Sequence, residues 1–183
     1  MKATKLDCMP GDAKKPLREF FEQYVDGTTE KARVPIAQLN LCNLTNIVAA
    51  RLELDGGKTF SVHVSTRALK HLYDKKPAEE FSCILDGLDE VVRYPMYVYR
   101  NKGGKRGTYC VVGAYDGISY ICSLEIIVTS SGGLGNVPMG LEPLGGATTE
   151  IEIQVATAFR KRDEKYLAKC VLLWSREDGT PPS

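Results

Sequence analysis

Apolar side chains recur every three or four positions in three segments before residue 95. This spacing predicts amphipathic helices at 17–25, 66–74 and 78–93. Ser65 is well placed to accept a hydrogen bond from the first turn of the second helix, and Pro95 cannot continue the third. We therefore expect a helical layer built from the first half of the chain.

A different pattern follows Pro95, where short runs of β-branched and aromatic residues alternate with turns. An earlier run from Phe60 to Val64 also predicts a short strand, whereas residues 34–54 fit either a strand or a helix. The runs after Pro95 lie at 96–101, 108–115, 119–128, 149–159 and 169–174. Because helices precede most of these strands, the order predicts an α+β fold, with N-terminal helices packed on a four- to five-stranded antiparallel sheet.

The length of 183 residues suggests one main domain with additions. We expect the domain at 59–176, preceded by a partly helical extension at 1–58 and followed by a flexible tail at 177–183. A glycine-rich loop at 130–149 interrupts the domain and lacks the GxxxxGK[ST] pattern of a nucleotide phosphate loop. Loops of this length are typically mobile or functional, so it is either a plain mobile loop or a lid over a site.

Charge and cysteine usage limit the possible environments. The net charge is +1, so a polyanionic partner has to be argued from local clusters. No apolar run approaches the roughly 20 residues that span a bilayer, and the N-terminus lacks the apolar segment of a signal peptide. No CxxC pair is present, and Cys110, Cys122 and Cys170 lie in apolar runs where thiols are typically buried and reduced. These features favour a cytoplasmic protein without a membrane partner.

The two histidines, His63 and His71, are the only side chains whose unperturbed pKa lies near neutral pH. His63 belongs to a predicted strand, and His71 lies one turn after Arg67 on the polar flank of the following helix. Each could have an ordinary surface or structural role. Their closeness at a strand–helix corner instead suggests that both border one cleft.

Cations gather in two segments that could bind an anion. Glycine-spaced lysines and arginines with free backbone N–H groups suit a phosphate, although basic hairpins also serve solubility. Alternate residues from Ile151 to Val155 share one face of a strand, and Thr157 ends that row just before the second segment, where it could donate to an anion or cap the turn. The segments contain Arg100, Lys102, Lys105 and Arg106, and then Arg160, Lys161, Arg162, Lys165 and Lys169.

Taken in order, four segments resemble a family of nucleases. They are "HVSTRALKHLYDKK", "LDGLDEVVRYPMYVYRNKGGKRGTYCVV", "SYICSLEIIV" and "EIQVATAFRKRDEKYLAKCVLLW". This order resembles the phage-associated branch of the barnase–EndoU–colicin–RelE (BECR) ribonuclease superfamily, from about Phe60 to Trp174. The resemblance implies a barnase-like sheet that carries the active site. It also implies metal-independent RNA cleavage, in which the 2′-hydroxyl attacks phosphorus and leaves a 2′,3′-cyclic phosphate.

The resemblance also implies roles for individual residues. His71 in "LKHL" is the first choice for a general acid or base, with His63 as its partner, and Glu125 is a further base or a group that orients a histidine. Thr157 and Arg160 would hold the scissile phosphate. Which residue is acid and which is base stays open. The residues expected to bind backbone phosphates are Lys102, Lys105, Arg106 and Lys161.

The expected partners are RNA and, if the chain is a phage, prophage or toxin effector, a neutralising protein. No metal or other cofactor is expected. Two other functions fit the same sequence: a non-catalytic module that binds nucleic acid or protein on the sheet, and a small-ligand protein whose loop closes over an apolar cavity beneath Gly132 to Gly146. The sequence does not determine the oligomeric state.

Overall fold

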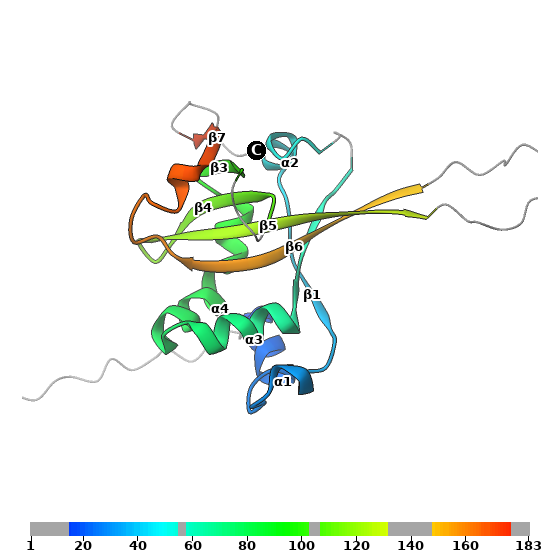
Figure 1. Cartoon of the computed structure of the whole chain (residues 1–183), viewed down its shortest axis with the longest axis vertical. Coiled ribbons are helices and arrows are strands. Elements are labelled where there is room, and N and C mark those ends of the chain that lie inside the picture. The colour runs from blue at the N-terminus through cyan, green and yellow to red at the C-terminus, as the bar shows by residue number, and fades with distance from the viewer. Residues whose placement is uncertain (1–14, 55–57, 103–106, 132–147, 177–183) are drawn as a thin grey trace, which may run out of the picture.

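The structure is a computed structural model that describes residues 15–54, 58–102, 107–131 and 148–176. Its elements follow the order helix, strand, helix, strand, two helices and five strands, with 3₁₀ turns at Lys31–Arg33 and Leu167–Lys169 (Figure 1). The helices are α1 (Pro16–Tyr24), α2 (Asn46–Arg51), α3 (Thr66–Lys75) and α4 (Ala78–Arg93). The strands are β1 (Gln38–Asn43), β2 (Ser61–Ser65), β3 (Tyr97–Asn101), β4 (Tyr109–Tyr115), β5 (Ile118–Ser131), β6 (Thr148–Arg160) and β7 (Cys170–Ser175).

The α+β class is confirmed, but the expected sheet of four to five antiparallel strands is wrong. The described strands form one seven-stranded sheet in the order β1-β2-β6-β5-β4-β3-β7. Residues 34–54 contain both alternatives at once, because β1 and α2 follow one another there. β1 pairs with β2, and β2 lies parallel to β6, whereas every other pairing is antiparallel. A short apolar run does not encode the direction of its neighbour, so the path of the chain decided this pairing.

The helix boundaries agree with the local signals in the sequence. The Ser65 hydroxyl accepts a hydrogen bond from the backbone N–H of Ala68 at 3.2 Å and so caps α3. Pro77 directly precedes α4, and the helix ends at Arg93, two residues before Pro95. The short helix expected at 17–25 is confirmed as α1 within one residue at each end.

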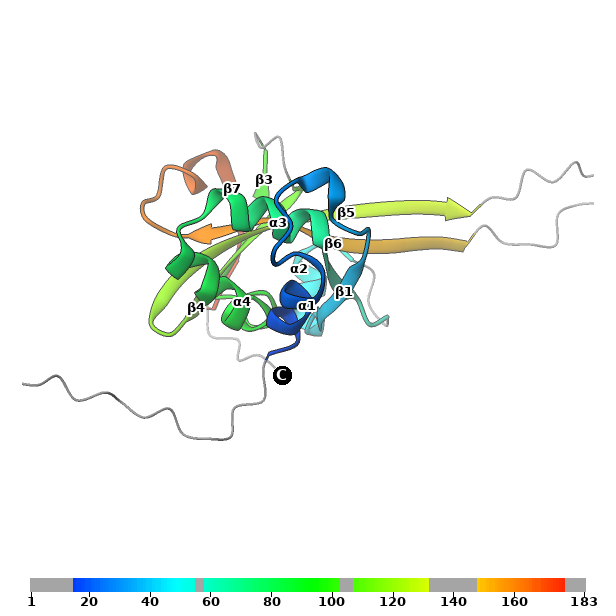
Figure 2. The same ribbon diagram turned by 90° about the horizontal axis from the view of Figure 1, so that it is seen from below.

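One main core joins the helices to the sheet. Viewed from below, α1, α3 and α4 lie in front of the strands (Figure 2). A Cβ on Gly113 of β4 would lie 2.8 Å from the Val91 carbonyl oxygen, so the glycine allows the backbone of α4 to approach the sheet closely. Arg18 of α1 forms a bidentate ion pair with Asp86 of α4, with N–O distances of 2.8 and 2.7 Å. Residues 16–43 therefore share the core of the segment 59–176.

A smaller second core lies on the opposite face of the sheet. Cys110, Val112 and Ile121 are buried there under Leu167, which belongs to the turn that leads into β7. Cys122 lies in the main core, so successive residues of β5 face opposite sides. All five described cysteines are free thiols; Cys110 and Cys122 are buried as expected, while Cys170 is half-buried.

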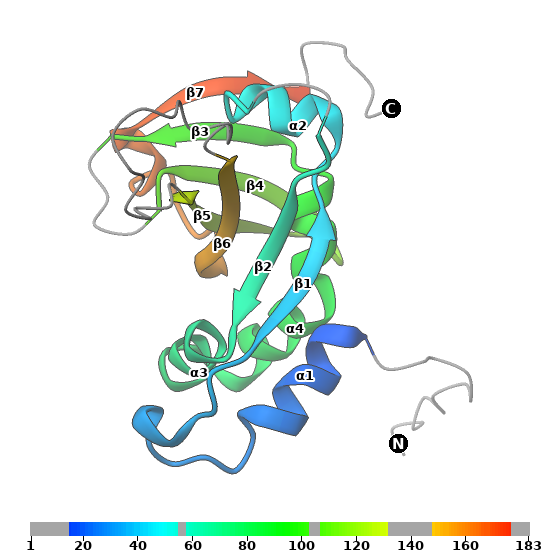
Figure 3. The same ribbon diagram turned by 90° about the vertical axis from the view of Figure 1, so that its right-hand side faces the viewer.

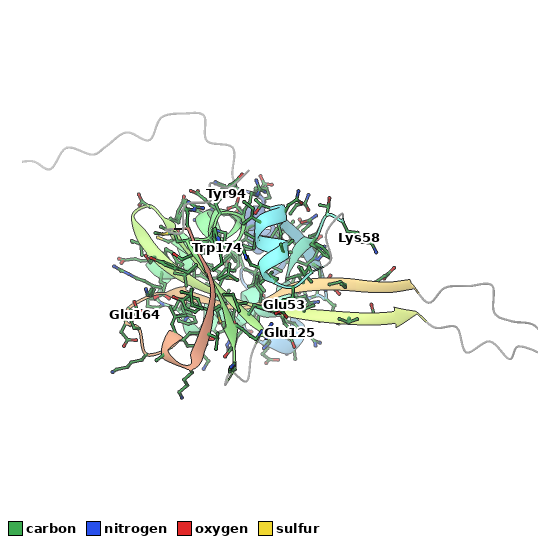
Figure 4. The ribbon with its side chains drawn as sticks, turned by 90° about the horizontal axis from the view of Figure 1, so that it is seen from above. Glu53, Lys58, Tyr94, Glu125, Glu164 and Trp174 are labelled. Carbon is green, nitrogen blue, oxygen red and sulfur yellow. The ribbon has the colours of Figure 1, made fainter. Side chains whose placement is uncertain are left out.

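β5 and β6 are the longest strands and extend beyond the rest of the sheet as a two-stranded arm (Figures 1 and 4). Two apolar side chains of the arm, Val128 and Ile151, are exposed. The expected glycine-rich loop at 130–149 lies mostly outside the described residues, as does the tail at 177–183. Among the described residues, no helix combines the length and apolar character required to cross a membrane.

Candidate functional site

The face of β5 and β6 opposite α4, here called the open face, carries Glu125 and Thr157, while the second core covers its other end, where Ile121 and Ser123 are buried. Glu125 pairs with Gln154, and Ser123 pairs with Thr157, so these four side chains lie on one face of the two strands. A bulge in β6 adds Ala156 to this row, since the register shifts between Ser123 and Leu124. The bulge also places Thr157 on the face opposite Ile153 and Val155, so the single row expected for these residues is wrong.

Helix α3 runs beside β6 and borders the open face. β2 pairs with β6 at only two positions, Val62 and His63, and the chain then turns into α3, which continues next to β6 (Figures 1 and 3). Arg67, His71 and Lys75 are four residues apart and therefore share one face of α3. These three side chains follow the edge of β6 over two helical turns.

The first candidate site is the hollow between α3 and the open face, here called the α3 hollow. Its volume is about 340 Å³, and it is lined by His71 and Arg67 from α3, Glu125 from β5 and Lys31 from the preceding 3₁₀ turn. Figure 4 shows Glu125 on β5 near the base of the arm. An imidazole, a carboxylate and two cations therefore meet around one open space, although His71 and Glu125 are far apart in sequence.

His63 lies in a different hollow from His71, so the expected shared cleft is not formed. The His63 hollow has a volume of about 430 Å³ and is lined also by Lys58, Glu150 and Glu152. His63 pairs with Gln154, which itself lines the α3 hollow, so the two hollows are neighbours. The Nδ1 atom of His63 is buried and finds no hydrogen-bond partner within the described residues.

Thr157 and Arg160 do not act as a pair, because they project from opposite faces of β6. Thr157 pairs with Ser123 on the open face, whereas Arg160 pairs with the core residue Tyr120 on the helical side. The backbone N–H of Arg160 donates to Glu80 of α4 at 3.0 Å. The side chain of Arg160 lines a separate cavity between α3, α4 and the end of β6.

This cavity, here called the basic corner, is lined by the four cations Lys75, Lys76, Arg160 and Arg162 and has a volume of about 380 Å³. Glu80 organises it: its side chain is 8% exposed and accepts from Arg162 at 3.1 Å, with Lys76 at 3.8 Å. Burial lowers the pKa of Lys76 and the nearby Arg162 lowers it further, while Glu80 opposes both.

An aromatic wall completes the basic corner. The Lys76 ammonium lies 4.9 Å from the centre of the Phe159 ring, and Phe159 packs edge-on against Tyr166. Burial raises the pKa of Tyr166 to about 12. The corner therefore combines a positive rim with neutral aromatic side chains.

The remaining expected phosphate ligands are scattered. Lys102 is exposed at the end of β3, and Lys105 and Arg106 lie outside the described residues. Lys161 is ion-paired with Glu164 at 2.5 Å, at the end of the molecule opposite the arm (Figure 4). Arg100 is ion-paired with Glu53 and so is partly neutralised.

Several lining residues were missed by the sequence interpretation, namely Lys31, Arg67, Gln154, Lys75, Lys76 and Glu80. A signal for part of this set was present, because the four-residue spacing from Arg67 through His71 to Lys75 places them on one helix face. The role of Glu80 had no such signal, since it depends on the end of β6 meeting α4. Within the described residues, no three His, Cys, Asp or Glu side chains gather as metal ligands.

No family model, curated protein or solved structure gives a significant match to this chain.

Proposed function

We propose that the chain is a metal-independent endoribonuclease whose active site is the α3 hollow. One observation carries the proposal: His71 and Glu125, from elements far apart in sequence, line the same open hollow together with the cations Arg67 and Lys31. These are the groups that RNA cleavage by an internal nucleophile requires. The resemblance to the BECR ribonucleases points to the same chemistry.

In this mechanism, one member of the His71–Glu125 pair removes the proton from the ribose 2′-hydroxyl. The 2′-oxygen then attacks the adjacent phosphorus, and the bond from phosphorus to the 5′-oxygen of the next nucleotide breaks. The other member protonates that departing oxygen. The products are a 2′,3′-cyclic phosphate and a free 5′-hydroxyl, so no water or redox partner is consumed in this step.

The cations serve the phosphoryl oxygens, on which negative charge accumulates in the transition state. Arg67 lies one helical turn before His71 and lines the same hollow, so its guanidinium can hold these oxygens beside the imidazole. Thr157 does not line the hollow, although its neighbour Ala156 does, so the proposal gives it no contact with the phosphate. In this proposal Glu125 takes the partner role first expected of His63, because His63 lines the neighbouring hollow.

The test is cleavage of a mixed-sequence RNA in EDTA by the full chain and by two matched histidine variants. We expect the wild type to produce fragments with 2′,3′-cyclic phosphate and 5′-hydroxyl ends. His71→Ala should lose roughly 100- to 10,000-fold in rate, the usual contribution of a general acid or base. His63→Ala should retain the wild-type rate. Equal rates for His71→Ala and the wild type, or cleavage that needs added metal, would refute the proposal.

An effector of this kind would also harm a host cell, and a neutralising protein would bind over the α3 hollow. Expression of the wild type should therefore slow growth, and His71→Ala should relieve the effect. Unchanged growth with both proteins, together with intact RNA in the assay above, would leave the binding module as the better account.

A non-catalytic binding module is favoured by one feature of the open face. Glu125 of β5 and Glu150 and Glu152 of β6 place three carboxylates along it, and the side-chain amide of Gln154 donates to Glu152 at 3.0 Å. Such a face suits a partner with basic groups better than RNA alone. Binding of RNA or protein without cleavage would identify this function. The small-ligand hypothesis concerns residues 132–146, which lie outside the described residues.

A further inference from the structure

The basic corner lies next to the α3 hollow along the same helix. His71 lines the hollow and Lys75 lines the corner, and the two residues are four positions apart on one face of α3. Four residues advance an α-helix by about 6 Å. On β6, the open-face residues run from Gln154 in the hollow to Phe159 in the corner. A chain molecule seated in the hollow can therefore continue into the corner.

The corner carries an excess of positive charge. Lys75, Lys76, Arg160 and Arg162 face only two carboxylates there among the described residues, Glu80 and Asp163. Glu80 is already occupied by Arg162, Lys76 and the backbone N–H of Arg160. Within the described part of the chain, the side chains of Lys75 and Arg160 form no ion pair or hydrogen bond. The four cations therefore exceed the two carboxylates, and Lys75 and Arg160 have no ion pair of their own among the described residues.

The opposite end of the open face has the reverse charge. Beyond the α3 hollow, towards the arm, the His63 hollow is lined by Glu150 and Glu152 and, among the described residues, by the single cation Lys58. A polyanion that passes through the α3 hollow is attracted at the corner and repelled at the arm. The charge therefore changes from negative to positive along the path from the His63 hollow, through the α3 hollow, to the basic corner.

We propose that the basic corner is a subsite for a backbone phosphate of RNA that flanks the scissile phosphate on one side only. This inference rests on the proposed function, because it takes the α3 hollow as the place of cleavage. Lys75 and Arg160 supply the free cations, and Glu80 holds Lys76 and Arg162 in place around them. The Phe159–Tyr166 wall offers an aromatic surface to the adjoining nucleotide.

The variant for the test is Lys75→Gln/Arg160→Gln, because it leaves the Glu80 network intact. The hydrogen bond from residue 160 to Glu80 is made by the backbone N–H and survives the substitution. The matched control is Lys165→Gln/Lys169→Gln, which removes the same charge from exposed positions that do not line the corner.

The binding measurement uses an all-deoxy oligonucleotide, which has no 2′-hydroxyl and so cannot be cleaved. Fluorescence anisotropy over a range of salt concentrations should show binding weakened roughly 3- to 30-fold in the corner variant, as expected for two exposed cation–phosphate pairs. The slope of log K against log salt should fall by about 0.7 for each phosphate that the variant leaves without a cation. The control should bind like the wild type. Equal binding by both variants would overturn the subsite whether or not the chain cleaves RNA.

The one-sidedness is tested with deoxy oligonucleotides that contain a single ribonucleotide, placed near the 5′ end in one and near the 3′ end in the other. Only the bond after the ribonucleotide can be cleaved. The wild type should prefer one of the two, roughly 3- to 30-fold in kcat/KM, and the corner variant should lose this preference. Both variants should cleave a dinucleotide, which is too short to reach the corner, at the wild-type rate.

Equal cleavage of the two oligonucleotides by the wild type would overturn a one-sided subsite. Absence of any cleavage would instead count against the proposed function.

Discussion

The α3 hollow and the His63 hollow are neighbours on one sheet and each contains one histidine, yet their surroundings differ in charge. The α3 hollow combines His71 with one carboxylate and the cations Arg67 and Lys31, whereas the His63 hollow places its histidine beside Glu150 and Glu152. A phosphoryl group is stabilised by the first set and repelled by the second. The presence of a histidine is therefore a weaker guide to phosphate chemistry than the charges that accompany it.

The largest expected difference between the hollows concerns their carboxylates. Glu125→Gln keeps the size of the side chain but removes the carboxylate for which we propose proton transfer, so RNA cleavage should fall roughly 100- to 10,000-fold. Glu152→Gln is the same substitution in the His63 hollow and should leave the rate within about twofold of the wild type, as expected for a substitution outside the catalytic pair. Initial rates on one RNA substrate check both values. A greater loss for Glu152→Gln than for Glu125→Gln would reverse the assignment of the two hollows.

A smaller difference is expected for the cations. Arg67→Gln removes the guanidinium for which we propose a charge-assisted hydrogen bond to the phosphoryl oxygens, and kcat/KM should fall roughly 10- to 100-fold. Lys58→Gln, on the His63 side, removes the same charge at an exposed position and should not change kcat/KM. The comparison is made under single-turnover conditions so that the chemical step is measured. If kcat/KM falls equally in the two variants, the charges act only through the general field of the protein.

The pH range in which the two hollows can be compared depends on Cys42. Cys42 lies on β1 beside the strand that carries His63, and burial raises the pKa of its thiol to about 11 from an ordinary value of 9.0, with Arg93 opposing. The folded state thus retains a proton that the unfolded state releases above about pH 9. The contribution of Cys42 to the free energy of unfolding should therefore be constant below about pH 9 and be lost between about pH 9 and 11, by up to about 2–3 kcal/mol. Burial also raises the pKa of Cys122 and Cys170, so these thiols add to the loss.

Urea unfolding at pH 8 and pH 10.5 checks this expectation. Cys42→Ala should be less stable than the wild type at pH 8, because the substitution removes a buried thiol; Cys42 is only 4% exposed. The difference in the free energy of unfolding between the two proteins should be smaller at pH 10.5. An unchanged difference would show that the thiol does not retain its proton in the folded state. With either outcome the Cys42 thiol stays protonated below about pH 9, so profiles of cleavage rate against pH in that range report on the groups that line the hollows.

The smallest expected effect concerns RNA affinity at the acidic end. Glu150→Gln/Glu152→Gln removes two negative charges from the His63 hollow and should tighten binding of an uncleavable oligonucleotide about two- to fivefold at low salt. High salt should abolish the gain, because these charges are exposed to solvent. Weaker binding by this variant would indicate that the carboxylates contact the ligand favourably.

The sequence predicted local structure well where one short-range signal was sufficient. Periodicity together with Ser65 and Pro95 located α3 and α4 to within one residue. The strands after Pro95 were also located correctly, because β-branched and aromatic runs are bounded there by turns. Residues 34–54 stayed ambiguous because a six-residue strand and a six-residue helix follow one another, and each is too short for its period to be read.

The candidate site was predicted only in part. His71 and Glu125 were both singled out, and the fold places them around one hollow. The expectation that His71 and His63 share one cleft was wrong, although they are only eight positions apart in the sequence. In the structure His63 pairs with Gln154 and lines one hollow, while His71 lines the neighbouring hollow. Thr157 and Arg160 fell on opposite faces for a similar reason: three positions along a strand reverse the side of the sheet.

Taken alone, the sequence determined the lengths and order of most helices and strands, the buried thiols and the residues capable of acid–base chemistry. These properties depend on neighbours within a few positions. The tertiary structure decided that β2 lies parallel to β6, that α3 continues beside β6, and that Glu80 gathers cations into a corner. Each of these features depends on contacts between segments that are distant along the chain. Packing and electrostatics stabilise one of several arrangements that local sequence patterns do not distinguish.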